Sequence, residues 1–253
     1  MKKFIYSFLM LCCVSMGTMF AQDANQTAAD KLRAEGDAAY KAKNYPTALA
    51  KYEAYLKADN YKDAQRIFVA AQCAYEAKDY ESLAKYSDMA IQKGQNAQNA
   101  YVFKAIALSN LNKTDEFKST IDAGLKAYPG NKNLEATAYN YFVKAGQAAQ
   151  KQGNITQADA DYTEVTTLSN PEYKGNALYA LGAMYYTKGS KAITAAYPLA
   201  QSAPEKYKAA KEKAAGDLNK AKGYLEQAKT TTPSSPRNAS IQKILDSITK
   251  LLK

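Results

Sequence analysis

Apolar positions recur three and four residues apart along most of the chain, in stretches that end at chain-reversing residues. Leu32, Gly36, Ala39 and Tyr40, for example, share one face of a predicted helix, which a break at Asn44–Tyr45–Pro46 ends. This spacing matches the α-helical period, and a proline fits the first turn of the helix that follows such a break. The pattern therefore predicts helices arranged in pairs and joined by short turns.

The helix pair repeats at a nearly constant interval. A glycine or alanine marks the same place in each first helix, with spacings of 35, 34, 41 and 36 residues, at Gly36, Ala71, Ala105, Gly146 and Gly182. A period in this range is typical of a solenoid of stacked repeats rather than of an enzyme domain. Because one helix pair cannot bury its own apolar face, we expect neighbouring pairs to stack on one another.

The fifth pair departs from the others. We expect its first helix to end at Lys188–Gly189, and residues 190–216 to form an insertion before the pattern resumes. Glu205–Lys229 is predicted to be one continuous helix. Ile193–Ala203, which contains Pro198 and is followed by Pro204, is predicted to be a loop or a broken helix. A last amphipathic helix within residues 237–253 is predicted to cap the stack.

The spacing of small residues and tyrosines resembles that of the tetratricopeptide repeat (TPR) family over about residues 29–233. Two repeats carry the resemblance best, through Gly36, Ala48 and Tyr52 and through Gly146, Ala158 and Tyr162. The resemblance implies an all-α fold, a right-handed superhelical solenoid of about five TPR helix pairs with a C-terminal capping helix. The predicted units are 29–62, 64–97, 98–131, 132–172 and 175–236.

The concave face of a TPR solenoid is lined by one side of each first helix. Carried over to this sequence, the resemblance implies a partner-binding groove formed by Arg33, Asp37, Tyr40, Phe68, Gln72, Tyr75, Val102, Ile106, Val143, Gln147, Tyr179 and Tyr186. Such a groove suits an extended peptide or an amphipathic helix. The alternative is that Phe68, Val102 and Ile106 only contact adjacent helices. Asp37 and Gln72 stand where carboxylate-clamping members carry asparagine, so a clamp for a C-terminal carboxylate is not expected.

The N-terminus has the order of a secretory signal peptide. Met1–Lys3 is basic, Phe4–Val14 is apolar apart from Ser7, and Phe20–Gln22 offers a cleavage site after Ala21. We therefore expect residues 1–21 to be removed, residues 22–28 to be flexible, and the protein to reach the periplasm or to associate with the envelope. The basic start and the ending of this segment resemble exported proteins of Bacteroidetes-type bacteria.

Composition excludes several kinds of chemistry. The chain has no histidine, which rules out Ser-His-Asp and Cys-His nucleophiles and histidine-based zinc sites. After signal removal Cys73 is the sole thiol, so no intramolecular disulfide forms, and we expect this cysteine to be a small buried residue. The chain shows no phosphate loop or cofactor motif, and we predict no catalytic residue, no cofactor and no metal.

The net charge of +10 is concentrated near the C-terminus, because Pro204–Lys253 holds 11 basic and 5 acidic residues. That stretch is either the solvated face of a long helix or a surface for acidic groups. We predict an exported, non-enzymatic scaffold of the cell envelope that binds a protein or peptide, with no nucleic acid partner and no membrane span after signal removal. The alternative is an assembly factor acting through residues 190–216 and the basic helix. The sequence leaves the partner and the oligomeric state open.

Overall fold

The structure, a computed structural model, describes residues 27–253, and these residues are helical apart from short turns. The predicted signal peptide, 1–21, lies outside the described residues. Thr27 and Ala28, which were expected to belong to a flexible N-terminus, are already part of a helix that runs over residues 27–41. The chain divides into an N-terminal unit, Met1–Pro129, and a C-terminal unit, Gly130–Lys253.

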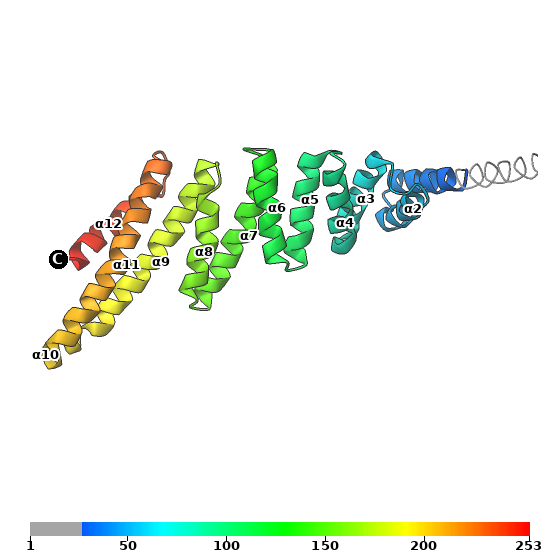
Figure 1. Cartoon of the computed structure of the whole chain (residues 1–253). Helices are drawn as coiled ribbons and strands as arrows, with labels where there is room; N and C mark the ends of the chain where they lie inside the picture. The colour runs from blue at the N-terminus through cyan, green and yellow to red at the C-terminus, as the bar shows by residue number, and fades with distance from the viewer. Residues whose placement is uncertain (1–26) are drawn as a thin grey trace, which may run out of the picture. The chain divides into compact units, whose positions relative to one another are not determined.

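The described part of the N-terminal unit is a succession of antiparallel helices, each packed against the next (Figure 1). After the helix at 27–41 come α2 (Tyr45–Ala58), α3 (Ala64–Ala77), α4 (Tyr80–Gln92), α5 (Ala97–Asn110) and α6 (Thr114–Ala127). The turns fall where the apolar pattern breaks, so the prediction of paired helices is confirmed here.

Short polar side chains start three of these helices. Asn44, Asp63 and Asp79 each accept a hydrogen bond from the backbone N–H three residues ahead, at 3.3, 2.9 and 3.1 Å. Such N-caps satisfy backbone donors that have no partner within the helix. The cap residues therefore set where α2, α3 and α4 begin.

The small residue of each first helix allows a large side chain of the second helix to approach closely. A Cβ added to Gly36 would lie 2.7 Å from Cε1 of Tyr52, which is buried, and one added to Gly146 would lie 2.8 Å from Cε1 of Tyr162. The hydroxyl of Tyr52 donates to Asp37 at 2.7 Å, so this ring is held in place at both ends. The spacing that carried the family resemblance is thus a packing contact.

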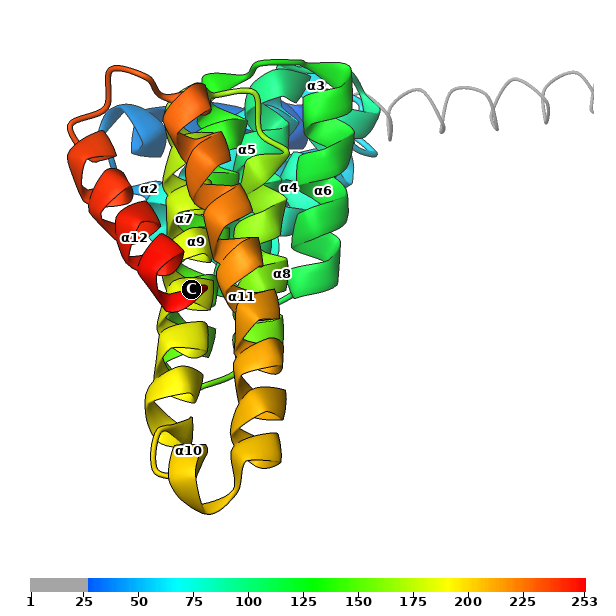
Figure 2. The ribbon, with the colours of Figure 1, turned by 90° about the vertical axis from the view of Figure 1, so that its left-hand side faces the viewer.

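The C-terminal unit consists of α7 (Lys132–Lys151), α8 (Ile155–Thr166), α9 (Pro171–Ala196), α10 (Leu199–Ser202), α11 (Pro204–Thr231) and α12 (Asn238–Leu251). Helices α9 and α11 form a long antiparallel hairpin, closed by the short α10, whose end projects beyond α7 and α8 (Figure 2). The predicted continuous helix over Glu205–Lys229 is confirmed by α11.

The predicted end of the fifth pair's first helix at Lys188–Gly189 is wrong, because α9 continues to Ala196. Gly189 is a buried helical residue with a Cβ position 2.9 Å from Cγ of Leu218. It is one of three glycines of α9, seven residues apart, that each face a side chain of α11 or of Thr232, the residue that follows it. The pairs are Gly175 with Thr232, Gly182 with Leu225 and Gly189 with Leu218.

This seven-residue register explains the error. Gly189 was expected to end the helix, but the glycines with positive φ in the described chain are Gly94, Gly130 and Gly153. Residues 190–216 are consequently helical for most of their length, and Ile193–Ala203 is a broken helix, one of the two forms predicted for it. They are the last turns of α9, all of α10 and the first half of α11, and the reversal falls at Pro198 and Ala203.

The last helix packs as a cap on this hairpin. Helix α12 contacts both α9 and α11, and it buries Ile241 and Ile248 against them. No helix within residues 27–253 combines the length and apolar character needed to cross a bilayer.

Candidate functional site

Eight of the twelve predicted groove residues lie on the first helices of the N-terminal unit, which are the helix at 27–41, α3 and α5. Helix α3 packs against α5, and Phe68, Gln72 and Tyr75 share one face of α3 because they are four and three residues apart. Arg66 of α3 reaches the preceding first helix, since its guanidinium donates to Asp37 at 3.0 Å. These helices therefore present adjacent faces.

Three rings form an aromatic strip, Phe68, Phe103 and Tyr75, across α3 and α5. Phe103 stacks against Phe68 with centroids 5.7 Å apart and against Tyr75 at 5.2 Å, and the interplanar angles are 15° and 18°. Phe68 is only 6% exposed, whereas Tyr75 is 40% exposed. The strip is therefore anchored in the core at one end and open to solvent at the other.

The sequence prediction missed Phe103. It named Val102 and Ile106 instead, and both are half-buried on α5. Phe103 and Ile106 pack against the core of the N-terminal unit. Phe68 also contacts the adjacent helix, as the alternative proposed. The sequence does not show whether Val102 or its neighbour Phe103 faces α3. That depends on the rotation of α5 about its axis relative to α3.

The polar residues of the predicted groove already have partners within the chain. Asp37 accepts from Tyr52 at 2.7 Å and from Arg66 at 3.0 Å, so it links the first two helix pairs. Arg33 pairs with Asp30 at 3.1 Å and keeps a half-exposed side chain. Tyr40 packs edge-on against Tyr45, and burial raises the pKa of its phenol. Asp37 thus contributes mainly to packing, while Arg33 remains accessible.

The other four predicted residues belong to the C-terminal unit, with Val143 and Gln147 on α7 and Tyr179 and Tyr186 on α9. Gln147 is exposed and the other three are half-buried. The guanidinium of Arg237, which precedes α12, lies 5.0 Å from the centroid of the Tyr179 ring. Arg237 therefore covers part of the Tyr179 surface that the prediction left open.

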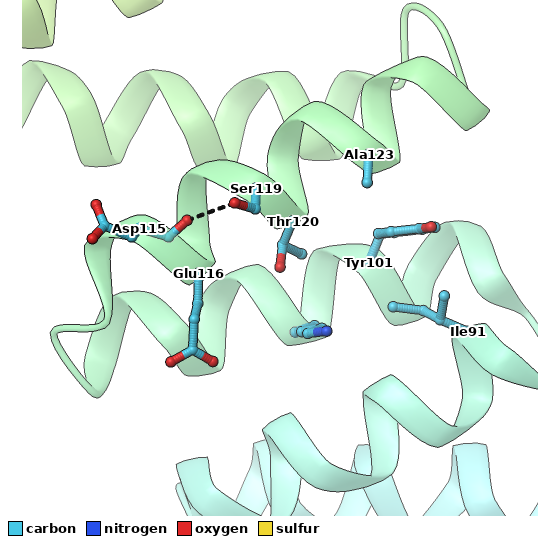
Figure 3. Close-up of a pocket in the computed structure, with 8 residues that line it drawn as sticks. Ile91, Tyr101, Asp115, Glu116, Ser119, Thr120 and Ala123 are labelled. Atoms are coloured by element: carbon cyan, nitrogen blue, oxygen red, sulfur yellow. Dashed lines mark hydrogen bonds between the residues drawn. The ribbon is translucent and has the colours of Figure 1, made fainter.

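The N-terminal unit also has a pocket of about 350 Å³ at α4, α5 and α6 (Figure 3). Figure 3 shows Asp115 and Glu116 beside it, and both residues are exposed. The ammonium group of Lys104 in the wall is paired with Asp88. The charged groups at this pocket are therefore either solvated or already paired within the chain. Within residues 27–253 no group of three His, Cys, Asp or Glu side chains is placed to hold a metal ion.

The stacked antiparallel helix pairs, with close contacts at small residues, define a helical-repeat protein. A TPR repeats protein from Bacteroides fragilis has a similar structure, with a TM-score of 0.79 and 36% sequence identity over 88% of this chain and 98% of that one. The chain therefore belongs to the TPR family, whose members are protein–protein interaction scaffolds, and the all-α TPR solenoid predicted from the sequence is confirmed.

Two more distant structures also align with the chain. The TPR domain of P58(IPK) is 16% identical with a TM-score of 0.44, over 92% of this chain and 67% of that one. YrrB, a TPR protein with an unusual peptide-binding site, is 15% identical with a TM-score of 0.42, over 89% and 97%. No family model matches the sequence, and no curated protein matches it.

Proposed function

We propose that the protein is a non-enzymatic adaptor that binds an extended peptide or an amphipathic helix of a partner protein on the first-helix face of the N-terminal unit. The exposed ring of Tyr75, stacked on Phe103, carries the proposal. Membership of the TPR family supports it, because these solenoids are interaction scaffolds. Aromatic side chains on such faces are frequent anchors for peptides.

The physical advantage of the strip is its rigidity. Phe103 holds Tyr75 on one side, so little side-chain entropy remains to be lost when a partner covers the ring. Removing a central aromatic anchor typically costs about 2 kcal/mol of binding free energy, which corresponds to a roughly 30-fold larger dissociation constant. Tyr75 is the residue of choice for a test because Phe68 is buried, and a substitution there would disturb the core.

We further propose that the protein acts in the cell envelope. The charged, apolar and small-residue order of residues 1–21 supports export. The partner would then be an envelope protein. Export is tested by N-terminal sequencing of the protein from the periplasmic fraction, where a first residue of Gln22 is expected. A chain that retains Met1 in the cytoplasm would contradict export without touching the binding proposal.

The binding test compares two tyrosine variants. Immobilised wild type, Tyr75→Ala and Tyr197→Ala are each exposed to a detergent-solubilised envelope extract, and captured proteins are quantified by mass spectrometry. Tyr197→Ala is the comparison variant, since Tyr197 is an exposed tyrosine of the C-terminal unit at 56% exposure and lies outside the groove. A partner that is lost with Tyr75→Ala and retained with Tyr197→Ala supports the groove. Its binding segment is then titrated as a synthetic peptide.

A second candidate function rests on the projecting end of the α9–α11 hairpin. The protein would then be an assembly factor of an envelope complex that makes contact through residues 190–216. The same experiment separates the two, because loss of the partner with Tyr197→Ala and retention with Tyr75→Ala would contradict the groove and favour the hairpin. Retention by both variants would contradict both proposals.

A further inference from the structure

The end of the hairpin carries the most exposed large apolar side chain among residues 27–253. Tyr197 is 56% exposed and follows the last turn of α9, just before Pro198 and Leu199. Its ring leans on Tyr207 of α11 with centroids 6.3 Å apart. We call residues 191–208 the hairpin tip. Packing within the chain therefore leaves about half of the Tyr197 side chain open to a partner.

The hairpin tip also carries three lysines. Lys191, Lys206 and Lys208 are exposed, and none of them forms an ion pair in the described part of the chain. With a rise of 1.5 Å per residue, Lys191 lies about 9 Å along α9 from Tyr197, and Lys208 lies about 6 Å along α11 from its start. Both distances are comparable with the Debye length, which is about 8 Å at physiological salt. Their charges therefore act together on a surface that contacts Tyr197.

The tip stands on a stiff support. Gly182 and Gly189 allow α9 and α11 to pack closely, and Leu218 and Leu225 fill the contact. Beyond it, Ile193 and Ala196 are still buried. The tip therefore extends past α7 and α8 as a continuation of a packed helix pair (Figure 2).

We propose that the hairpin tip binds the surface of an anionic lipid bilayer. Tyr197 and Leu199 would enter the headgroup layer, where an amphipathic ring is stable, and Lys191, Lys206 and Lys208 would neutralise lipid phosphates. This contact is independent of the groove on the N-terminal unit. It would hold the protein at a membrane from which the groove reaches its partner.

Lipid fits the tip better than an acidic protein does. A protein partner would be recognised by a shaped surface, whereas the tip presents one exposed ring and exposed lysines that form no ion pair in the described part of the chain. Glu205 is the one acidic residue of residues 191–208, so the net charge of the tip is positive. Long lysine side chains beside an interfacial aromatic are typical of membrane-surface contacts.

The test is a vesicle co-sedimentation assay with the mature chain starting at Gln22, so that the apolar stretch Phe4–Val14 cannot itself bind lipid. Vesicles contain phosphatidylcholine alone or phosphatidylcholine and phosphatidylglycerol in a two-to-one ratio. We expect binding to the anionic vesicles, weak binding to the neutral ones, and at least a tenfold loss when salt is raised to about 0.5 M, because salt screens the lysines.

The variants separate charge from insertion. Lys206→Glu/Lys208→Glu should weaken binding to anionic vesicles at least tenfold, and Tyr197→Ser should weaken it severalfold. Lys144→Glu/Lys151→Glu on α7 is the matched control, since it makes the same charge change on exposed lysines of the same unit. Circular dichroism establishes that each variant keeps its helices.

Three results would overturn the proposal. One is failure of the wild type to bind anionic vesicles, and another is an equal loss with the control pair, which would indicate net charge rather than the tip. The third is binding of soluble polyglutamate as strong as vesicle binding, combined with no effect of Tyr197→Ser, which would indicate an acidic protein surface as the ligand. None of these results changes the Tyr75→Ala measurement, so the two proposals fail separately.

Discussion

Replacing Gly182 by alanine tests whether close approach of α9 and α11 holds the C-terminal unit together. The new Cβ would lie 2.5 Å from Cγ and 2.8 Å from Cδ2 of Leu225, and 3.2 Å from the backbone oxygen of Ala221. Cγ is the branch point of a fully buried leucine, so it cannot rotate away. The helices would therefore have to move apart.

The magnitude follows from two opposing effects. Carbon atoms pack at about 3.5–4.0 Å, so a contact of 2.5 Å requires a shift on the order of 1 Å. Overpacking of this kind costs about 1–3 kcal/mol. Alanine gains about 1 kcal/mol over glycine inside a helix. We expect Gly182→Ala to lower the free energy of unfolding by up to about 2 kcal/mol, and the midpoint of thermal unfolding by up to about 8 °C.

Gly216 supplies the matched control. It lies inside α11 with no atom within 4 Å of its Cβ position, so Gly216→Ala should show the propensity gain alone. We expect a rise of about 0.5–1 kcal/mol in the free energy of unfolding. Thermal and urea unfolding are followed by circular dichroism for both variants and the wild type. Stabilisation of the protein by Gly182→Ala, equal to that by Gly216→Ala, would refute the reasoning.

Three further outcomes are expected. Cys73 is fully buried, and burial raises the pKa of its thiol to about 12, so a thiol reagent should react with it only after denaturation. Burial and the nearby Asp159 raise the pKa of Tyr185 to about 12 from its unfolded value of about 10. The contribution of Tyr185 to the free energy of unfolding is therefore complete below pH 10 and is lost between about pH 10 and 12. Urea unfolding at a series of pH values will measure this loss. A free energy of unfolding that does not change over this range would contradict the expectation. Glu135 is almost fully buried, and its carboxylate accepts a hydrogen bond from the backbone N–H of Ser169 at 2.8 Å. Glu135→Ala should therefore lower the free energy of unfolding, measured in urea, by about 1–3 kcal/mol. An unchanged urea midpoint would exclude the contact.

Much of the fold could be predicted because the apolar pattern and the turn residues act locally. Asn44 and Asp79 cap helices through their immediate neighbours, and Gly36 marks a contact whose partner, Tyr52, lies a set distance along the chain. The aromatic strip could not be predicted, because Phe103 meets Tyr75 only through the rotation of α5 against α3. Side-chain exposure on a helix face depends on such rotations, which a single sequence does not specify.

The sequence of the α9–α11 hairpin repeats small residues every seven positions, in addition to the longer repeat of the helix pairs. Glycines at 175, 182 and 189 are seven residues apart, and Ala214, Ala221 and Ala228 on the other helix have the same spacing. All three alanines are buried. A seven-residue spacing keeps two helices in contact along one seam. The contact between Gly182 and Leu225 is therefore followed, seven residues further along α9, by the contact between Gly189 and Leu218. The insertion therefore lengthens an existing contact rather than adding a loop, since a loop would not bury Ala214 and Leu218. The lengthened pair carries its tip beyond α7 and α8, which makes residues 191–208 available for a contact that the rest of the C-terminal unit does not make.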